Sequence, residues 1–138
     1  MASIHKEIHV RARPDQVWSA VRDIGALHTR FVPGFVVDTK LEPGARVVTF
    51  GNGMVVREAI VDIDETDFRL VWSASGGRLS HHNASVQVFP ASGDRTRIVW
   101  IADLLPDEMR GPIEGMIDQG MAVMKTTLDA LAGSSRAA

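Results

Sequence analysis

The sequence predicts an α+β domain in which a curved antiparallel sheet of about seven strands wraps around one long C-terminal helix. Apolar residues recur at helical spacing over residues 112–131, which predicts that helix. Before it, strand-like segments are joined by connectors too short for a parallel return, which takes about a dozen residues. A helix of about 20 residues and strands of about nine both span roughly 30 Å, so one sheet can cover most of the helix.

The N-terminal part predicts one strand followed by two short helical pieces. Residues 4–10 alternate between apolar and polar side chains, as a half-buried strand does. Pro14 suits the first turn of a helix, and the apolar face of that helix consists of Val17, Trp18, Val21 and Ile24. Gly25 ends this helix, and a short segment at 26–29 precedes a turn at 33–34.

The middle of the chain predicts six further strands, at 35–41, 46–50, 55–63, 68–74, 81–89 and 96–102. Asn52-Gly53 is a strong hairpin signal, because these residue types supply the positive φ angles of a tight turn. The other connectors are equally short, so neighbouring strands are expected to pair in antiparallel fashion. Residues 1–133 are expected to form a single domain, and residues 134–138 a flexible tail.

The apolar face of the C-terminal helix is rich in methionine and glycine: Ile113, Met116, Ile117, Gly120, Met121, Met124, Leu128 and Leu131. Unbranched methionine fills irregular space, and glycine inside a helix costs about 1 kcal/mol relative to alanine. A helix that accepts Gly115 and Gly120 suggests either a ligand cavity beneath it or close packing of the glycines against the sheet. Both interpretations are open at this point.

Composition excludes several function classes. The 138 residues carry a formal net charge of −2 with scattered basic residues, which argues against a nucleic-acid surface. There is no cysteine, so disulfides, thiol nucleophiles and thiolate metal sites are excluded. No apolar run approaches the ~20 residues that span a bilayer, and His5 and His9 interrupt any signal-like N-terminus. We therefore expect a cytoplasmic protein, either a monomer or a homodimer.

Three stretches resemble a known superfamily. Residues 12–18 look like the start of its first helix, and Gly44-Ala45-Arg46 with Gly53 and Arg57-Glu58 looks like its third and fourth strands. Residues 76–79 are similar to the loop that gates the cavity in plant hormone receptors. Over nearly the whole chain, the order of elements resembles the helix-grip fold of the START, birch-pollen-allergen and polyketide-cyclase superfamily (SRPBCC), in its polyketide cyclase/dehydrase-like branch. That fold hosts carriers, receptors, cyclases and co-chaperone domains, so it does not decide function.

Strand parity predicts which side chains face the interior, because successive residues point to opposite faces. The later strands give consistent inner faces: Phe68, Leu70, Trp72 and Ala74; His82, Ala84, Val86 and Val88; Ile98, Trp100 and Ala102. Arg46 shares a face with Val48 and Phe50. In the strand 55–63 hydrophobicity alone turns Glu58 outward, whereas the resemblance implies that it faces the cavity.

If Glu58 faces inward, Arg46 is its natural partner, because a buried carboxylate needs a cation and a guanidinium can bind it through two hydrogen bonds. Such a pair either satisfies itself or anchors the polar end of a ligand. His82 lines the same interior, as a hydrogen-bonding group or as an acid/base. His28 lies where the resemblance places the cavity mouth, and it is otherwise a surface histidine. No histidine spacing suits a metal, and no cofactor is expected.

The leading hypothesis is binding of a small, mostly apolar, ring-containing molecule in an internal cavity. The expected ligand-binding residues are His28, Arg46, Val48, Phe50, Glu58, Trp72, Leu79, His82, Ala84, Val86, Trp100, Met116, Gly120, Met121 and Met124. The alternative is a polyketide cyclase/dehydratase-like enzyme, in which His82 or Glu58 moves a proton and Arg46 stabilises an enolate. A third interpretation is an interaction domain with a filled interior. Trp72 and Trp100 suit ring stacking, but plain core packing explains them equally well.

Overall fold

The computed structural model describes the backbone of residues 1–137 and the side chains of residues 1–133. Its core element is one seven-stranded antiparallel sheet with the order β1-β7-β6-β5-β4-β3-β2. The strands are β1 (Ala2–Val10), β2 (Val36–Glu42), β3 (Ala45–Phe50), β4 (Val55–Asp64), β5 (Arg69–Ser75), β6 (His81–Ala91) and β7 (Arg95–Leu105). Each strand agrees with a predicted one to within a few residues at its ends, and the predicted fold class is confirmed.

Two helices and four short helical turns complete the chain: α1 (Pro14–Arg22), η1 (Ile24–Ala26), η2 (Leu27–Phe31), η3 (Ser92–Asp94), η4 (Asp107–Met109) and α2 (Arg110–Ala137). The first helix is shorter than its apolar pattern predicts, because the chain leaves it at Asp23 and continues in η1. The η2 segment is a single turn of π-helix, which sequence periodicity does not reveal.

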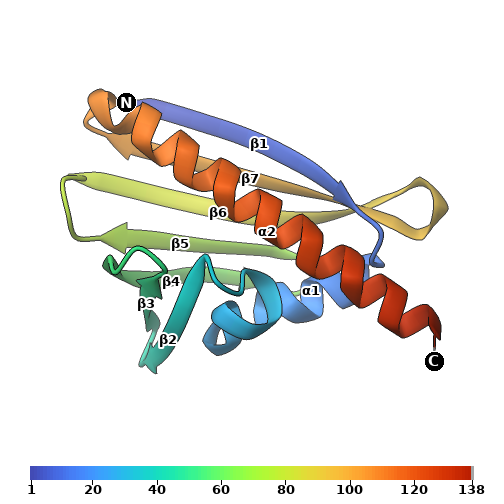
Figure 1. Cartoon of the computed structure of the whole chain (residues 1–138). Helices are drawn as coiled ribbons and strands as arrows, with labels where there is room; N and C mark the ends of the chain where they lie inside the picture. The colour runs from blue at the N-terminus through green and yellow to red at the C-terminus, as the bar shows by residue number, and fades with distance from the viewer. Residues whose placement is uncertain (138) are drawn as a thin grey trace.

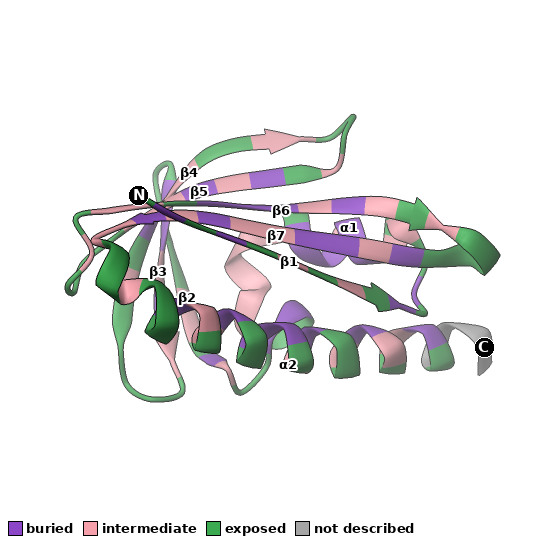
Figure 2. Cartoon of the chain, turned by 90° about the horizontal axis from the view of Figure 1, so that it is seen from above, coloured by how far each residue is buried: buried purple, intermediate pink, exposed green. Residues whose placement is uncertain are grey.

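Helix α2 lies across the inner face of the curved sheet, and the short helices α1 to η2 close the interior beside it (Figure 1). The buried residues of α2 form a stripe that faces the strands, while its other side meets solvent (Figure 2). The most completely buried large side chains include Ile4, Ile98, Leu104, Met124 and Leu128, which come from β1, β7 and α2. The core is therefore a sheet–helix layer, as the dimensions of the elements predict.

Strand β4 contains a β-bulge that changes which residues face inward. Its register with β5 shifts between Ile60 and Asp62, and Val61 is 59% exposed. Ile60 and Ile63 are both partly buried against the core, on either side of the bulge. Alternation is thereby broken, because a bulge inserts one unpaired residue into a strand.

Two predicted boundaries differ from the structure. Phe68 was predicted to begin a strand, but it lies in the turn before β5 with a φ of 54°, and its ring stacks on Trp18 with centroids 5.2 Å apart. Helix α2 extends beyond Leu131 to Ala137. The expectation of a flexible tail at 134–138 stays an expectation, since 134–137 continue the helix and residue 138 lies outside the described part. Within that described part, no helix is long and apolar enough to cross a membrane.

Candidate functional site

A cavity of about 80 Å³ lies between the sheet, helix α2 and the η2 region. Since about 10–15 Å³ of such space holds one water molecule, the cavity has room for several waters. Its lining is apolar except for three residues: Val21, Leu27, Phe31, Val32, Phe35, Val36, Arg46, Phe50, Glu58, Leu70, Trp72, His82, Val86, Trp100, Ile113, Met116 and Ile117. An apolar wall with a few placed polar groups is typical of small-molecule sites.

Arg46 and Glu58 form a buried ion pair in this cavity. They are directly opposite residues on the adjacent strands β3 and β4, and Arg46 Nε donates to Glu58 Oε1 at 2.8 Å. Arg46 is 3% exposed and Glu58 is 7% exposed. Glu58 therefore faces inward, as the resemblance implied and as hydrophobicity alone did not. The expected two-point contact is a single hydrogen bond here.

Other groups around Arg46 hold the guanidinium in place. Its Nη1 donates to the carbonyl of Ile24 at 3.4 Å, and its Cζ lies 5.7 Å from the centre of the Trp72 ring. A cation over a tryptophan face is attracted by the ring quadrupole. Among the described residues, neither Arg46 Nη2 nor Glu58 Oε2 has a protein hydrogen-bond partner. Of the buried side-chain nitrogen and oxygen atoms in the described residues, only Trp18 Nε1 and Trp100 Nε1 lack a hydrogen-bond partner. The free donor and acceptor of the ion pair are therefore not fully buried atoms.

Burial changes the protonation behaviour of both acid/base groups in the cavity. Desolvation raises the pKa of the Glu58 carboxyl, and the charge and hydrogen bond of Arg46 oppose that rise. Desolvation lowers the pKa of His82, and the positive charge of neighbouring His81 lowers it further. His82 is consequently held in its neutral form near pH 7, where an imidazole offers one donor and one acceptor.

The three polar residues lie in one row across the sheet. Glu58 is opposite Arg46 on one side and Ala74 on the other, and His82 is one residue beyond the last pair of the β5–β6 ladder, Ser73 and Asn83. Since adjacent strands lie about 4.8 Å apart, the Cα atoms of Glu58 and His82 are separated by roughly 10 Å. Ala74 is the residue between them in this row, and its side chain is a single methyl group.

Eight of the fifteen expected ligand-binding residues line the cavity: Arg46, Phe50, Glu58, Trp72, His82, Val86, Trp100 and Met116. The other seven do not. His28 is instead hydrogen-bonded to Thr39, with Nδ1 and Oγ1 3.0 Å apart. Leu79 is half-buried against the edge of the core, in the turn closed by the Gly76–Leu79 bridge.

The other five expected residues, Val48, Ala84, Gly120, Met121 and Met124, also lie outside the cavity lining. Val48, Ala84, Met121 and Met124 are buried in the core outside the cavity lining. At Gly120 an added Cβ would lie 3.1 Å from Phe35 Cε2 and 3.2 Å from Trp100 Cζ3. Gly120 thus fits the close-packing interpretation, and a Cβ at Gly115 would meet nothing within 4 Å. Ile113, Met116 and Ile117, one turn or more towards the N-terminus of α2, form the roof of the cavity.

Sequence reasoning missed the wall made by residues 27–36. Leu27, Phe31, Val32, Phe35 and Val36 line the cavity. The four-residue spacing of Leu27 and Phe31 was an available signal, but the segment was too short to predict as a helix.

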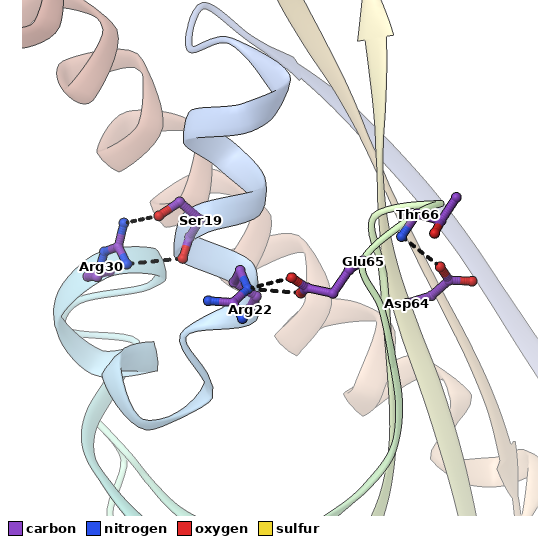
Figure 3. A network of polar contacts seen from close by, with 6 residues as sticks. All are labelled: Ser19, Arg22, Arg30, Asp64, Glu65 and Thr66. Carbon is purple, nitrogen blue, oxygen red and sulfur yellow. Dashed lines mark hydrogen bonds and ion pairs between the residues drawn. The ribbon is translucent and has the colours of Figure 1, made fainter.

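Polar contacts at the surface hold this wall in place. Arg30 donates from Nη1 to the Ser19 carbonyl at 3.0 Å and from Nη2 to Ser19 Oγ at 2.9 Å, which ties η2 to α1 (Figure 3). Arg22 Nε in turn contacts Glu65 Oε1 at 2.8 Å, which ties α1 to the β4–β5 turn (Figure 3).

An outer groove adjoins the cavity. It has a volume of about 200 Å³ and is lined by Gly34, Phe35, Phe50, Gly51, Asn52, Met116 and Gln119. Phe35, Phe50 and Met116 line both spaces, and the two phenylalanine rings meet edge to face with centroids 5.4 Å apart. The loops on either side touch at Gly51, where a Cβ would lie 2.5 Å from the Gly34 carbonyl oxygen. These three side chains therefore form the wall between the cavity and the surface.

No group of three or more His, Cys, Asp or Glu side chains within the described part of the chain is arranged to hold a metal ion. The polar groups of the cavity are one cation, one carboxylate, one imidazole and the indole N–H of Trp100, a buried donor without a partner among the described residues. These groups can form an ion pair, exchange a proton, and donate single hydrogen bonds to an enclosed molecule or accept them from it.

A curved antiparallel sheet that grips a long C-terminal helix around an apolar cavity defines the helix-grip class. Residues 1–134 match the family described as "Polyketide cyclase / dehydrase and lipid transport", and the chain belongs to that family. The resemblance to the polyketide cyclase-like branch of SRPBCC is thereby confirmed. A comparison with curated protein sequences gives no match.

Solved structures share the fold. The protein XoxI from Bacillus cereus is 14% identical with a TM-score of 0.83, over 93% of this chain and 96% of that one. A Thermobifida fusca protein is 27% identical with a TM-score of 0.79, over 97% and 95%. Norcoclaurine synthase from Thalictrum flavum, in complex with dopamine and hydroxybenzaldehyde, is 20% identical with a TM-score of 0.73, over 96% and 87%.

Proposed function

We propose that this protein binds a small, mostly apolar, ring-containing molecule in the cavity between the sheet and α2. The observation that carries the proposal is the lining, in which fourteen apolar side chains surround one buried ion pair and one histidine. A cavity lined mainly by apolar atoms gains free energy when an apolar molecule fills it. The family description, which names lipid transport beside cyclase activity, is consistent with this function.

The aromatic side chains favour a ring as the ligand. Trp72 and Trp100 line the cavity with their rings 6.0 Å apart at an angle of 62°. Aromatic pairs prefer such edge-to-face or offset geometries, and a ligand ring is able to join them. The similar norcoclaurine synthase structure contains dopamine and hydroxybenzaldehyde, which are both ring compounds. Met116 is the lining side chain that adapts most easily to ligands of different shape.

The test is the melting temperature in the presence of a panel of small uncharged aromatic compounds. A ligand that binds only the folded state stabilises it by about 2.7 kcal/mol at one hundred times its Kd, so melting should shift upward. Val86→Phe extends a ring into the cavity and should abolish the shift. Gln87→Phe is the matched control, because the next residue of β6 points to the opposite face. No shift for any compound in the panel would contradict the proposal.

A second candidate is a proton-transfer enzyme of the polyketide cyclase/dehydrase type. The favouring observation is that a carboxyl with a raised pKa and a neutral imidazole lie in the same cavity as Arg46. His82 would remove a proton from the carbon beside a ligand carbonyl, and Arg46 would stabilise the developing enolate. The interior cavity also counts against the third interpretation, an interaction domain that is filled with side chains.

Deuterium exchange separates the enzyme from the carrier. Acetophenone in D₂O loses its methyl protons through an enolate, and NMR measures the rate. If the protein is an enzyme, His82→Ala should slow the exchange by about 10²–10⁴-fold while acetophenone affinity is retained. His5→Ala should leave the rate unchanged, since His5 is an exposed histidine on β1 outside the cavity lining. Exchange no faster than in buffer would exclude the enzyme and leave the carrier.

A further inference from the structure

We propose, on the basis of the proposed function, that the cavity selects uncharged ligands carrying a hydroxyl group and rejects carboxylates. The structural reason is that the Arg46–Glu58 pair already balances the charge of the cavity and leaves one carboxylate oxygen without a partner. The proposal concerns the polar end of the ligand, whereas the apolar lining determines only its size and ring character.

The first step is the charge of the lining. Among the lining residues only Arg46 and Glu58 are ionised side chains, with their interacting atoms 2.8 Å apart, and His82 is neutral near pH 7. A guanidinium is permanently charged in proteins, so Glu58 is required as its counter-ion. The sum over the cavity is therefore zero, and any charged ligand would leave one buried charge without a partner.

The second step is the remaining hydrogen-bonding capacity. Glu58 Oε1 accepts from Arg46, while Glu58 Oε2 accepts nothing from the described residues. A carboxylate is an acceptor only, so the group that completes it is a donor. A ligand hydroxyl supplies such a donor without a charge, and a hydrogen bond between a hydroxyl and a carboxylate is among the stronger kinds. His82 offers a further donor or acceptor about 10 Å away across Ala74.

The third step is the effect on a carboxylate ligand. Such a ligand would be able to accept a hydrogen bond from the free Arg46 Nη2, but it would place a second negative charge beside Glu58 in a mainly apolar cavity that holds a single cation. Removal of the Glu58 charge by Glu58→Gln reverses this situation, because Arg46 then lacks a counter-ion and a ligand carboxylate supplies one. The sign of the selectivity is thus expected to invert with a single substitution.

The experiment compares three ligands of similar size: p-cresol, 4-methylbenzoate and toluene. Binding is followed at pH 7 by the indole N–H resonances in ¹H–¹⁵N NMR spectra of the whole chain. Trp72 and Trp100 line the cavity and report on binding, whereas Trp18 lies outside the lining against Phe68 and serves as the internal reference. The control variant is Glu42→Gln, which removes a carboxylate from the half-exposed pair that Glu42 on β2 forms with Arg57 on β4.

The wild-type protein should bind p-cresol more tightly than toluene, and 4-methylbenzoate at least roughly tenfold more weakly than p-cresol. Glu58→Gln should bind 4-methylbenzoate more tightly than p-cresol, and Glu42→Gln should keep the wild-type order. An apolar cavity of any kind disfavours a carboxylate, so the inversion in Glu58→Gln is the decisive result. Equal or tighter binding of 4-methylbenzoate by the wild type, or an unchanged order in Glu58→Gln, would overturn the proposal.

A double variant guards against misfolding of Glu58→Gln. Replacement of a buried ion pair by apolar residues of similar volume is often neutral or stabilising, so Arg46→Leu/Glu58→Leu is expected to fold. It should bind p-cresol no more tightly than toluene, because the acceptor for the hydroxyl is absent. A p-cresol preference that persists there would refute the role of Glu58. If the wild-type protein binds all three ligands with similar affinity, only this inference fails. If it binds none of the three, the proposed function is contradicted as well.

Discussion

Trp72 on β5 and Trp100 on β7 contact each other edge to face across the strand that separates them. Their ring centroids are 6.0 Å apart, and the intervening residue Ala84 on β6 is directly opposite Trp72. Val86, two residues further along β6, is directly opposite Trp100, so the small Ala84 side chain leaves room on the Trp72 side of the pair. The two largest aromatic groups of the cavity thus depend on a small neighbour that does not itself line the cavity.

Ala84→Leu should therefore change the shape of the cavity, although Ala84 itself does not line it. The added atoms would push the Trp72 and Trp100 rings apart, and overpacking of this kind costs about 1–3 kcal/mol. We expect a lower free energy of unfolding in urea and weaker binding of ring compounds. The exposed position Asn83 on the same strand provides the control, since Asn83→Leu should affect neither quantity strongly. Unchanged ligand affinity in Ala84→Leu would show that the ring pair is not part of the site.

Removal of Arg46 alone should lower the free energy of unfolding much more than removal of Arg46 and Glu58 together. Arg46→Met leaves the Glu58 carboxylate buried without a partner and should lower the free energy of unfolding by about 3–5 kcal/mol. Arg46→Met combined with Glu58→Leu should recover most of that loss. Arg57→Met, in the half-exposed pair with Glu42, should cost no more than about 1 kcal/mol. Urea unfolding of the four proteins tests this, and equal losses at Arg46 and Arg57 would contradict the burial argument.

His82 should make the protein less stable in acid. Its pKa in the folded state lies below the ordinary value of 6.5, because burial and His81 disfavour the charged form. The unfolded chain then binds more protons than the folded one as the pH falls below 6.5, and the free energy of unfolding decreases. The slope from one such group is at most about 1.4 kcal/mol per pH unit.

The difference between the wild type and His82→Gln isolates this effect from that of Glu58, whose raised pKa acts with the opposite sign. His82→Gln should flatten the decrease between its folded-state pKa and pH 6.5, and the exposed His5→Gln should not. Urea unfolding over this pH range provides the measurement. Parallel curves for the wild type and His82→Gln would show that His82 is not desolvated.

The two glycines of α2 should respond differently to alanine. Gly115→Ala should raise the free energy of unfolding by about 0.5–1 kcal/mol, because its Cβ meets nothing and alanine favours the helix. At Gly120 the new Cβ would lie 3.1 Å from Phe35 and 3.2 Å from Trp100, so the helix gain is offset by crowding. Thermal unfolding and the Trp100 indole resonance test the contrast. Equal stabilisation by both substitutions would show that the rings of Phe35 and Trp100 move aside without a cost in stability.

The fold was predictable because its signals are local. Seven strand patterns, short connectors and one amphipathic helix each predict an element from neighbouring residues alone. The inward position of Glu58 was not predictable from hydrophobicity, because Val55 and Val61 are exposed while the bulge after Ile60 breaks the alternation. Apolar residues on the outer face therefore concealed the true inner face of β4.

The sequence also did not allow us to predict which residues mark the boundary of the cavity. A helical stripe tells which side of α2 is inward, but not that Ile113, Met116 and Ile117 lie over the cavity while Met121 and Met124 fill the solid core. The wall at 27–36 forms where a single π turn is tied to α1 by Arg30. Such contacts join residues that are distant along the chain, so no local pattern records them.

The position of Arg46 and Glu58 on one hairpin, β3–β4, has a consequence for how such proteins diversify. Both ionised side chains of the cavity lie on this hairpin, whereas the shape of the cavity is set by aromatic and aliphatic groups that mostly lie on other segments. Under the proposed function, substitution of these two amino acids together would change which ligands bind, while the segments that give the cavity its shape stay the same. In the proposed function, ligand preference and cavity shape therefore depend on different parts of the chain.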